Sequence, residues 1–558
     1  MTISRLGSLG GLNEKQQEEL LRLDTLNYVP KVTYSTRPCM VVYPENPRMK
    51  KRTYSHIEIA LMIERNAAKI RELGLKPREA VALIAPNGME LAILFMTLQW
   101  AGAIGVPLDP SLGEDFMAEV IKDTGCKIII SPLIEASERK TNELWNKVER
   151  IAKKTEAISW HMYFDRNSGV GFETGGVRAA KHAAWHSGNK DLTLDPKEIA
   201  MRVVVPLKGK HLVLSLKQED YCYAIKSFAK TYELKPSVMT VLSSPVYSLQ
   251  GLLTVLAVMY SGGGMVIQAG GTFEPSKVWD NVKEDQVKWM SLTSEQVIEL
   301  ANVTIDSKVE VTKDMQLDFI RSCPGVLAKG QVEKLEKIFK CPVVESYGPP
   351  EASGFATANT EFEQKSSTLG KAVRGVNVGV FDLVTKKRKG PNERGHIAVM
   401  GENVIGTGYD NDADETENSR FWDENDLEHK SIEDAWMFTG DEGEFDDEGF
   451  LTVYLQEERK LAAGKIAAGA LGAAAVGGAA AGIASAAGGE PEQASRGLPS
   501  MFEEEEQKKA AAAAAAEKKK QEDAEKKKKA EEEAKRKKEE EKKAKEEEKK
   551  AKEEEKKA

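Results

Sequence analysis

The chain has 558 residues and a net charge of −9, and its five cysteines are widely separated. This length exceeds what one hydrophobic core usually holds, so subdomains are expected. No stretch forms a basic face of one sign, which argues against nucleic acid as a partner. The lack of CxxC pairs and of a secretory apolar run at the start favours reduced thiols in an intracellular, cytoplasmic compartment.

Composition divides the chain into four predicted parts. Residues 1–44 form an N-terminal extension, and residues 45–460 carry the regularly spaced apolar clusters and turn glycines of a globular domain. Residues 461–502 are rich in Ala and Gly, and residues 503–558 contain little except Lys, Glu and Ala. A large hydrophobic core is therefore expected within the second part.

The globular part begins with an alternation of helices and strands. A helix is predicted over 53–75, because Thr53 or Ser55 can cap it, apolar residues recur at helical spacing and Gly74 ends it. The pattern continues with a strand at Ala80–Ala85, a helix at Met89–Ala101, a strand at Ile104–Leu108, a helix around Asp115–Thr124 and a strand at Lys127–Ser131. This alternation predicts an α/β fold with a parallel sheet covered on both faces.

In the rest of the globular part, the sequence pattern changes twice. Residues 133–195 are polar and irregular, and we interpret them as an insertion or a diverged connection. The alternation resumes through Val203–Val205, a helix from Gln218, Met239–Leu242, a helix at Gly251–Tyr260 and Met265–Gln268. After Gly370, glycine-punctuated segments predict a smaller β subdomain; they are Val376–Phe381, His396–Met400 and Gly449–Tyr454.

Five blocks of the sequence resemble the acyl-CoA synthetases of the adenylate-forming, AMP-binding family, most of all the oxalate/malonate-type CoA ligases. The blocks are RELGLKPREAVALIAPNGMELAILFMTLQWAGAIGVPLDP (71–110), LDFIRSCPGVLAKGQVEKLEKIFKCPVVESYGPPEA (317–352), TLGKAVRGVNVGVF (368–381), GHIAVMGENVIGTGYDN (395–411) and WMFTGDEGEFDDEGFLTVY (436–454). Their order and spacing agree with the family over about 45–460. The resemblance implies two parallel-sheet α/β subdomains and a small β-barrel, with ATP bound between them and a mobile C-terminal domain following.

The resemblance also implies roles for individual residues. Tyr347 matches the tyrosine that stacks on adenine, with Gly348 beside it, and Asp441 matches the aspartate that binds the ribose hydroxyls. Glu351 matches the carboxylate that holds Mg²⁺, and Lys208 is the lysine left from the phosphate loop, so these two are the catalytic candidates. The residues alone also allow a plainer interpretation, with Tyr347 as a core aromatic and Glu351 and Asp441 as solvated turn residues.

The largest departure from the family lies where its Ser/Thr/Gly-rich phosphate loop is expected. The chain reads MRVVVPLKG (201–209) and then LVLS (212–215), so only Lys208-Gly209 survive. The glycines that let backbone N–H groups approach phosphate are gone, and the β-branched Val203–Val205 favour a strand. Losing one donor to a transition-state oxyanion costs about 2.7–4 kcal/mol, so the loss of several predicts impaired catalysis.

Other departures agree with this prediction. Pro350 replaces a threonine of the adenine block, and Ser248 and Gln250 stand where the family often has histidines near the acyl pocket. Leu455–Arg459 replaces the Gly-Arg-x-Lys hinge. The family's C-terminal domain, with its second catalytic lysine and its CoA-binding surface, is not recognisable after residue 460.

The segments after residue 460 carry two further predictions. Residues 466–489 are uncharged and long enough to span a bilayer, but Ala and Gly are only weakly apolar, so a flexible linker and a membrane contact both stay open. Residues 503–558 place Glu and Lys three and four residues apart, which indicates a solvated single helix. This helix is interpreted as a spacer or an arm for a protein partner, with a disordered tail as the alternative.

Three hypotheses about function follow. The first is a catalytically impaired acyl-CoA synthetase relative, retained as a binding or scaffold module for a carboxylic acid or acyl group. The second is an active ATP-dependent acid–CoA ligase that uses ATP, Mg²⁺ and CoA and forms an acyl-adenylate. The third is a membrane-tethered structural protein. Use of ATP is the property that separates the enzyme from the other two.

Overall fold

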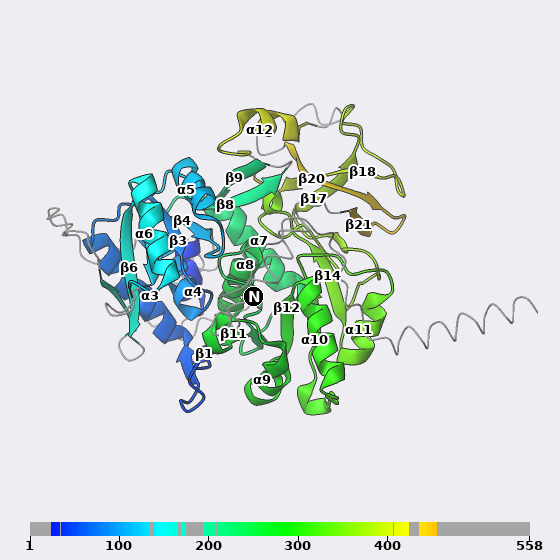
Figure 1. The fold of residues 1–558 in the computed structure, drawn as a ribbon. Coiled ribbons are helices and arrows are strands. Elements are labelled where there is room, and N and C mark those ends of the chain that lie inside the picture. The colour runs from blue at the N-terminus through cyan, green and yellow to red at the C-terminus, as the bar shows by residue number, and fades with distance from the viewer. Residues whose placement is uncertain are drawn as a thin grey trace, which may run out of the picture. The chain divides into compact units, whose positions relative to one another are not determined.

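The computed structural model describes residues 24–132 apart from residue 34, and residues 139–165, 169–173, 193–207, 210–405, 407–422 and 435–454 (Figure 1). The chain divides into two units, Met1–Ser485 and Ala486–Ala558, and every described residue belongs to the first. The predictions for Lys208 and for segments 466–489 and 503–558 lie outside the described residues.

The first α/β subdomain contains a seven-stranded sheet in the order β7-β6-β5-β3-β4-β8-β9. Strands β6, β5, β3, β4 and β8 run parallel, whereas β7 and β9 pair antiparallel at the two edges. The strands are β3 (Ala80–Ile84), β4 (Ile104–Leu108), β5 (Ile128–Pro132), β6 (Ile158–Asp165), β7 (Gly169–Glu173), β8 (Ile199–Leu207) and β9 (Lys210–Lys217). Because β3 and β4 are buried along their whole length, they behave as central strands covered on both faces. The predicted parallel α/β fold is confirmed.

The first long helices lie close to their predicted bounds. They are α3 (His56–Glu72), α4 (Met89–Ala101) and α5 (Glu114–Asp123). At the start of α3, the Ser55 hydroxyl accepts a hydrogen bond from the Glu58 backbone N–H, and the Glu58 carboxylate accepts one from the Ser55 N–H at 2.7 Å. This capping box satisfies two N–H groups of the first turn and fixes the helix start at His56.

Replacing Ser55 by Ala is expected to lower the free energy of unfolding by about 1 kcal/mol, because α3 loses its cap. Urea unfolding of Ser55→Ala measures the change. Ser111→Ala is the matched control, because Ser111 is exposed and, among the described residues, hydrogen-bonds only through its backbone N–H, to Asp109. Equal losses in the two variants would contradict the role of the cap.

The prediction that 133–195 is irregular is wrong for its described middle part. Residues Glu143–Thr155 form helix α6, and β6 extends the parallel sheet beside β5. Helix α6 buries only Val148, Ile151 and Ala152 among many charged residues. Such a narrow apolar stripe is enough to pack a surface helix, but it is easily overlooked in a polar stretch.

The second α/β subdomain contains two sheets, in the orders β10-β11-β1-β2 and β12-β13-β14-β15-β16. The strands are β1 (Pro38–Val42), β2 (Arg52–Ser55), β10 (Met239–Val241), β11 (Gly264–Ile267), β12 (Trp289–Leu292), β13 (Phe319–Ser322), β14 (Val343–Tyr347), β15 (Thr357–Ala358) and β16 (Lys371–Ala372). Its helices are α7 (Gln218–Thr231), α8 (Leu249–Ser261), α9 (Val278–Asp285), α10 (Ser294–Asp306) and α11 (Gln331–Phe339). Strand β1 falls within the predicted N-terminal extension and lies between β11 and β2.

The segments after Gly370 form the predicted small β subdomain. Its strands are β17 (Val376–Phe381), β18 (Gly395–Gly401), β19 (Arg420–Phe421), β20 (Trp436–Phe445) and β21 (Leu451–Tyr454), with helix α12 (Ala413–Ser419) alongside. All pairings are antiparallel, and β20 pairs with β18, β19 and β21. In the described part of the chain, β17, β19 and β21 each pair with one strand of this subdomain.

Helices α4 and α8 lie between the sheets and join the subdomains into one body (Figure 1). In α4 every residue except Glu90 is buried, and in α8 every residue except Leu249 and Tyr260. One hydrophobic core includes both helices together with residues of all three subdomains. Among the described helices, none has both the length and the apolar character that a membrane crossing needs.

Candidate functional site

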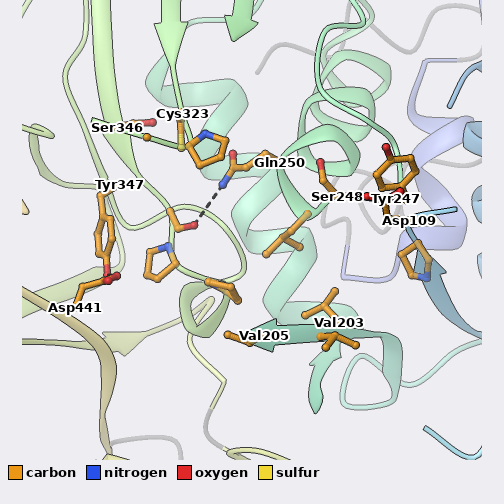
Figure 2. A pocket seen from close by; sticks show the side chains of 18 of the residues that line it. Asp109, Val203, Val205, Tyr247, Ser248, Gln250, Cys323, Ser346, Tyr347 and Asp441 are labelled. Atoms are coloured by element: carbon orange, nitrogen blue, oxygen red, sulfur yellow. Dashed lines mark hydrogen bonds between the residues drawn. The ribbon is translucent and has the colours of Figure 1, made fainter. Parts of the chain in front are cut away.

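A cavity of about 280 Å³ lies where the three subdomains meet (Figure 2). Its walls are formed by the loop after β4, by β8, by the start of α8, by the loops after β13 and β14, and by one residue of β20. This volume is near the lower limit for pockets that hold small molecules. The carboxyl ends of β4, β13 and β14 all contribute, which is where parallel sheets usually bind ligands.

Two of the predicted nucleotide-site residues meet on one wall. Tyr347 ends β14 and Asp441 lies in β20, and both are buried. The Tyr347 hydroxyl donates to Oδ2 of Asp441 at 2.7 Å and lies 2.9 Å from the hydroxyl of Thr439. The structure therefore brings Tyr347 and Asp441 together, and Asp441 is not a solvated turn residue.

Replacing Tyr347 by Phe is expected to lower the free energy of unfolding by about 1–3 kcal/mol, because the buried Asp441 carboxylate loses a hydrogen-bond donor. Denaturant unfolding measures the loss. The control is Tyr454→Phe, since the Tyr454 hydroxyl meets Glu444 at 3.3 Å on the surface. An unchanged midpoint in Tyr347→Phe would show that the pair with Asp441 does not stabilise this wall.

Gly348 begins a loop that turns back on itself at Gly354. A Cβ atom on Gly348 would lie 1.9 Å from the Gly354 carbonyl oxygen, so no side chain fits. The side-chain amide of Gln250 donates to the carbonyl oxygen of Gly348 at 3.3 Å (Figure 2) and to that of Gly354 at 2.7 Å. The sequence marked Gln250 only as a departure from a family pattern, whereas the structure shows that it holds both ends of this loop.

Of the other two site candidates, Glu351 is not brought to the cavity wall, and Lys208 lies outside the described residues. Glu351 lies in the short 3-10 helix η6 (Pro350–Ala352), is fully buried, and accepts a hydrogen bond from the Tyr409 hydroxyl at 2.9 Å. It is not a lining residue, although Pro349 and Pro350 are. No group of three His, Cys, Asp or Glu residues with the geometry to hold a metal occurs in the described ranges. The roles of Glu351 and Lys208 stay predictions.

The segment that departs most from the family forms a β-hairpin. Val203, Val204 and Val205 lie in β8 and pair with Leu214, Val213 and Leu212 of β9. Because Leu207 pairs with Lys210, only two residues separate the strands. Alternate backbone N–H groups of β8 are therefore directed to β9 and are not available to an anion. All three valines line the cavity.

Polar contacts tie this hairpin to the segment after β18. Arg202 of β8 and the Ser215 hydroxyl of β9 both donate to Oδ2 of Asp410, at 3.1 and 2.6 Å. The Asp410 N–H donates to the Val213 carbonyl at 2.7 Å, and the Val213 N–H donates to the Asn411 side chain at 2.8 Å. The hairpin is thus held by hydrogen bonds from both of its strands, which the sequence motifs did not reveal.

The lining fits a nucleoside better than a triphosphate. Tyr347 offers an aromatic face and Asp441 a carboxylate, the groups suited to a base and to sugar hydroxyls. In the β8 part of the wall, the described lining consists of valine side chains, and no described lining residue is Lys or Arg. Asp109 adds a second carboxylate, and burial followed by the charge of Asp109 raises the pKa of Tyr247, which keeps its phenol neutral. The described residues therefore do not fit the phosphates of ATP with Mg²⁺.

Comparison with known proteins places the chain in a family. The AMP-binding enzyme family matches residues 33–201 and 215–409, and the interruption at 202–214 coincides with the β8–β9 hairpin. The chain is 25% identical over 412 residues to the oxalate–CoA ligase of Arabidopsis thaliana, covering 72% of this chain and 73% of that one. It is 26% identical over 404 residues to the oxalate–CoA ligase of Saccharomyces cerevisiae, covering 67% and 68%.

The fold is also similar to solved structures. The long-chain-fatty-acid-CoA ligase FadD1 from Archaeoglobus fulgidus gives a TM-score of 0.64 at 18% identity, covering 77% of this chain and 83% of that one. ATP-bound MatB from Rhodopseudomonas palustris gives 0.62 at 18% identity, covering 77% and 78%. The family match covers more than half of this chain. The chain belongs to the AMP-binding enzyme family.

Proposed function

We propose that this chain is an AMP-binding family member that binds a small ligand in the cavity but has lost most of its capacity to activate that ligand with ATP. It is retained as a binding or scaffold module. The observation that carries the proposal is the β8–β9 hairpin, whose valines stand where phosphate-binding groups are needed.

The physical reason lies in the chemistry of phosphoryl transfer. Little covalent chemistry falls to the protein, so the rate depends on donors and cations that position and stabilise the phosphates. Each positioned donor contributes about 2.7–4 kcal/mol, or roughly 10²–10³ in rate. A hairpin that directs alternate N–H groups to a neighbouring strand, and places valine side chains at the cavity, supplies fewer of these donors.

The second candidate is an active ATP-dependent acid–CoA ligase. It is favoured by the meeting of Tyr347, Gly348 and Asp441 on one wall, and by the names of the relatives in Arabidopsis thaliana and Saccharomyces cerevisiae. In this reading the ligand is a carboxylic acid and the cofactors are ATP, Mg²⁺ and CoA. Tyr347 and Asp441 would then hold the nucleoside, as the resemblance implies.

Calorimetric titration with AMP and with ATP plus Mg²⁺ tests the proposal without any assumption about the acid. We expect ATP to bind no more tightly than AMP, because the described cavity wall offers nothing to its β- and γ-phosphates. Asp441→Asn is expected to weaken AMP binding, whereas the exposed Asp447→Asn is not. An ATP affinity tenfold or more above that of AMP would contradict the proposal.

A further inference from the structure

The turn between β17 and β18 exposes two neighbouring apolar side chains. Val384 is 87% exposed and Leu383 is 44% exposed, and neither residue lines the cavity. The other large apolar residues that are exposed in the described ranges stand apart from one another in the sequence; they are Met49, Ile158, Val326, Phe362 and Tyr454. Single exposed apolar side chains are common on protein surfaces, whereas adjacent ones at a turn indicate a place where something binds.

The backbone of this turn is held by its own hydrogen bonds. The Asp382 carboxylate accepts from the N–H groups of Val384 at 3.1 Å and Thr385 at 2.9 Å, and from the Thr385 hydroxyl at 3.0 Å. The Lys386 N–H donates to the Asp382 carbonyl at 3.0 Å, and the Asp382 N–H donates to the Lys387 carbonyl at 2.9 Å. Because these bonds fix the turn, its apolar side chains are presented without any ordering of the backbone on binding.

Four consecutive cationic residues follow the apolar pair: Lys386, Lys387, Arg388 and Lys389. Asp382 is the one acidic residue of 382–389, so this segment carries a net charge of +3 in a chain whose net charge is −9. Lys387 and Arg388 are exposed, whereas Lys389 lies 3.7 Å from the Asp382 carboxylate. Positive charge is thus concentrated directly beside two exposed apolar side chains.

An acidic turn on the neighbouring hairpin limits this basic surface on one side. Asp447 of that turn accepts from the Asn392 side chain at 3.2 Å. Its neighbours Asp446 and Glu448 both pair with Lys365, at 2.7 and 3.0 Å, so part of the acidic charge is neutralised within the protein. A negatively charged partner is therefore expected to approach the basic segment 386–389 and not the side at Asn392.

Exposed aliphatic side chains next to long cationic ones fit the surface of an anionic lipid bilayer. Leu and Val gain free energy on entering the boundary between headgroups and acyl chains, and Lys and Arg are attracted to acidic headgroups. The long stems of Lys and Arg let their charges stay at the headgroups while shorter apolar side chains go deeper. The turn offers both kinds of side chain within seven consecutive residues, 383–389.

We propose that the β17–β18 turn docks this protein on an anionic lipid bilayer. Leu383 and Val384 enter the bilayer surface, and the cations of 386–389 face the acidic headgroups. The contact is peripheral and needs no membrane-spanning helix. It goes beyond the proposed function and does not depend on it, because none of the cavity's lining residues belongs to this turn.

Co-sedimentation of the full chain with lipid vesicles tests the docking site. We expect binding to vesicles of phosphatidylcholine and phosphatidylserine in equal parts, weaker binding at high salt, and little binding to phosphatidylcholine alone. Lys387→Gln/Arg388→Gln is expected to weaken binding by about 25-fold, from roughly fivefold for each cation. Leu383→Ser/Val384→Ser is expected to weaken it by roughly tenfold or more. Thermal unfolding midpoints show whether both variants fold as the wild type does.

Matched controls change the same kinds of side chain elsewhere on the surface. Lys122→Gln/Lys127→Gln removes two exposed cations, and Phe362→Ser removes an apolar side chain that is 75% exposed. Both controls are expected to bind vesicles as the wild type does. Any vesicle binding by residues 466–489 stays in all of these variants, so it is distinguished from binding by the turn.

A fluorescent label measures insertion directly. All five native cysteines are buried, so an environment-sensitive maleimide dye is expected to react with a new, exposed cysteine at Val384→Cys. We expect its emission to shift to the blue on phosphatidylserine vesicles, because the dye leaves water for the acyl boundary. The same dye on Phe362→Cys is expected to show no shift.

Three results would overturn the proposal. The first is a wild-type chain that does not sediment with phosphatidylserine vesicles, and the second is binding that neither double variant of the turn weakens. The third is a loss of binding in Lys387→Gln/Arg388→Gln alone, with no blue shift at Val384→Cys, which would point to an acidic protein surface as the partner. A chain that docks on vesicles and also uses ATP keeps the docking site while refuting the proposed function.

Discussion

Gly348→Ala is expected to lower the free energy of unfolding by about 3 kcal/mol, because the added methyl group overlaps backbone that cannot move aside. The new Cβ would lie 1.9 Å from the carbonyl oxygen of Gly354 and 2.7 Å from the side-chain nitrogen of Gln250. To accept it, the loop must separate its two ends and give up the hydrogen bonds from Gln250. Urea unfolding gives the loss of stability.

The same change is expected to open the Tyr347 wall, because Tyr347 directly precedes the loop. Hydrogen exchange of the peptide that covers 347–354 reports this opening. Gly390→Ala is the matched control: Gly390 is exposed and its added Cβ would approach nothing closer than 3.7 Å. A Gly348→Ala variant as stable as Gly390→Ala would contradict the packing described for this loop.

Glu345→Gln is expected to stabilise the protein by about 3 kcal/mol at pH 8 and to leave it nearly unchanged at pH 4.5. Glu345 lies in β14, is 1% exposed, and accepts a hydrogen bond from the Leu327 N–H at 2.8 Å. Burial is the main cause that raises its pKa from 4.5 to about 7, with the Leu327 N–H opposing it and the charge of Glu333 adding to it.

The sign of the pH dependence follows from which state, folded or unfolded, binds the Glu345 proton more tightly. Below pH 4.5 the carboxyl is protonated in both states and contributes nothing. Between pH 4.5 and 7 the folded state keeps a proton that the unfolded state has lost, so stability falls as pH rises. Above pH 7 the Glu345 carboxyl is ionised in both the folded and the unfolded state. The difference between its pKa of about 7 in the folded state and 4.5 in the unfolded state corresponds to about 3 kcal/mol of lost stability, at about 1.36 kcal/mol per pKa unit. Gln keeps the acceptor for Leu327 but never ionises.

Thermal unfolding of Glu345→Gln and wild type at pH 4.5 and pH 8 measures this difference. The exposed Glu361→Gln is the control, and it is expected to show no dependence on pH. A variant that gains equal stability at both pH values would contradict the raised pKa.

Much of the fold can be predicted from the sequence because local signals and burial agree. The run MELAILFMTLQWA, followed by Gly102, gives α4 with its observed bounds, since the helix is apolar on nearly all sides and ends at a left-handed glycine. The apolar runs at Ala80 and Ile104 give β3 and β4 for the same reason. Helix α6 was not predicted, because its three buried residues stand among Lys and Glu.

The sequence likewise predicts only some of the residues of the candidate site. Tyr347, Gly348 and Asp441 can be found because they lie in blocks that match a family pattern, and the structure brings them to one wall. The valine run predicts a strand, and β8 confirms it. The sequence could not show that Arg321 and Gln250 meet, because they are 71 residues apart and only the packing of β13 against α8 brings them together.

The rate of pyrophosphate release from ATP and Mg²⁺, measured with a panel of carboxylic acids, shows whether the cavity still activates a ligand. Ordinary enzymes turn over at about 10 s⁻¹, and the loss of two phosphate donors lowers this by roughly 10⁴. We therefore expect a rate of about 10⁻³ s⁻¹ or slower with every acid. A rate of about 1 s⁻¹ or faster with any one acid would show that the β8–β9 hairpin does not prevent phosphate handling, and would contradict the proposed loss of ATP-dependent activation.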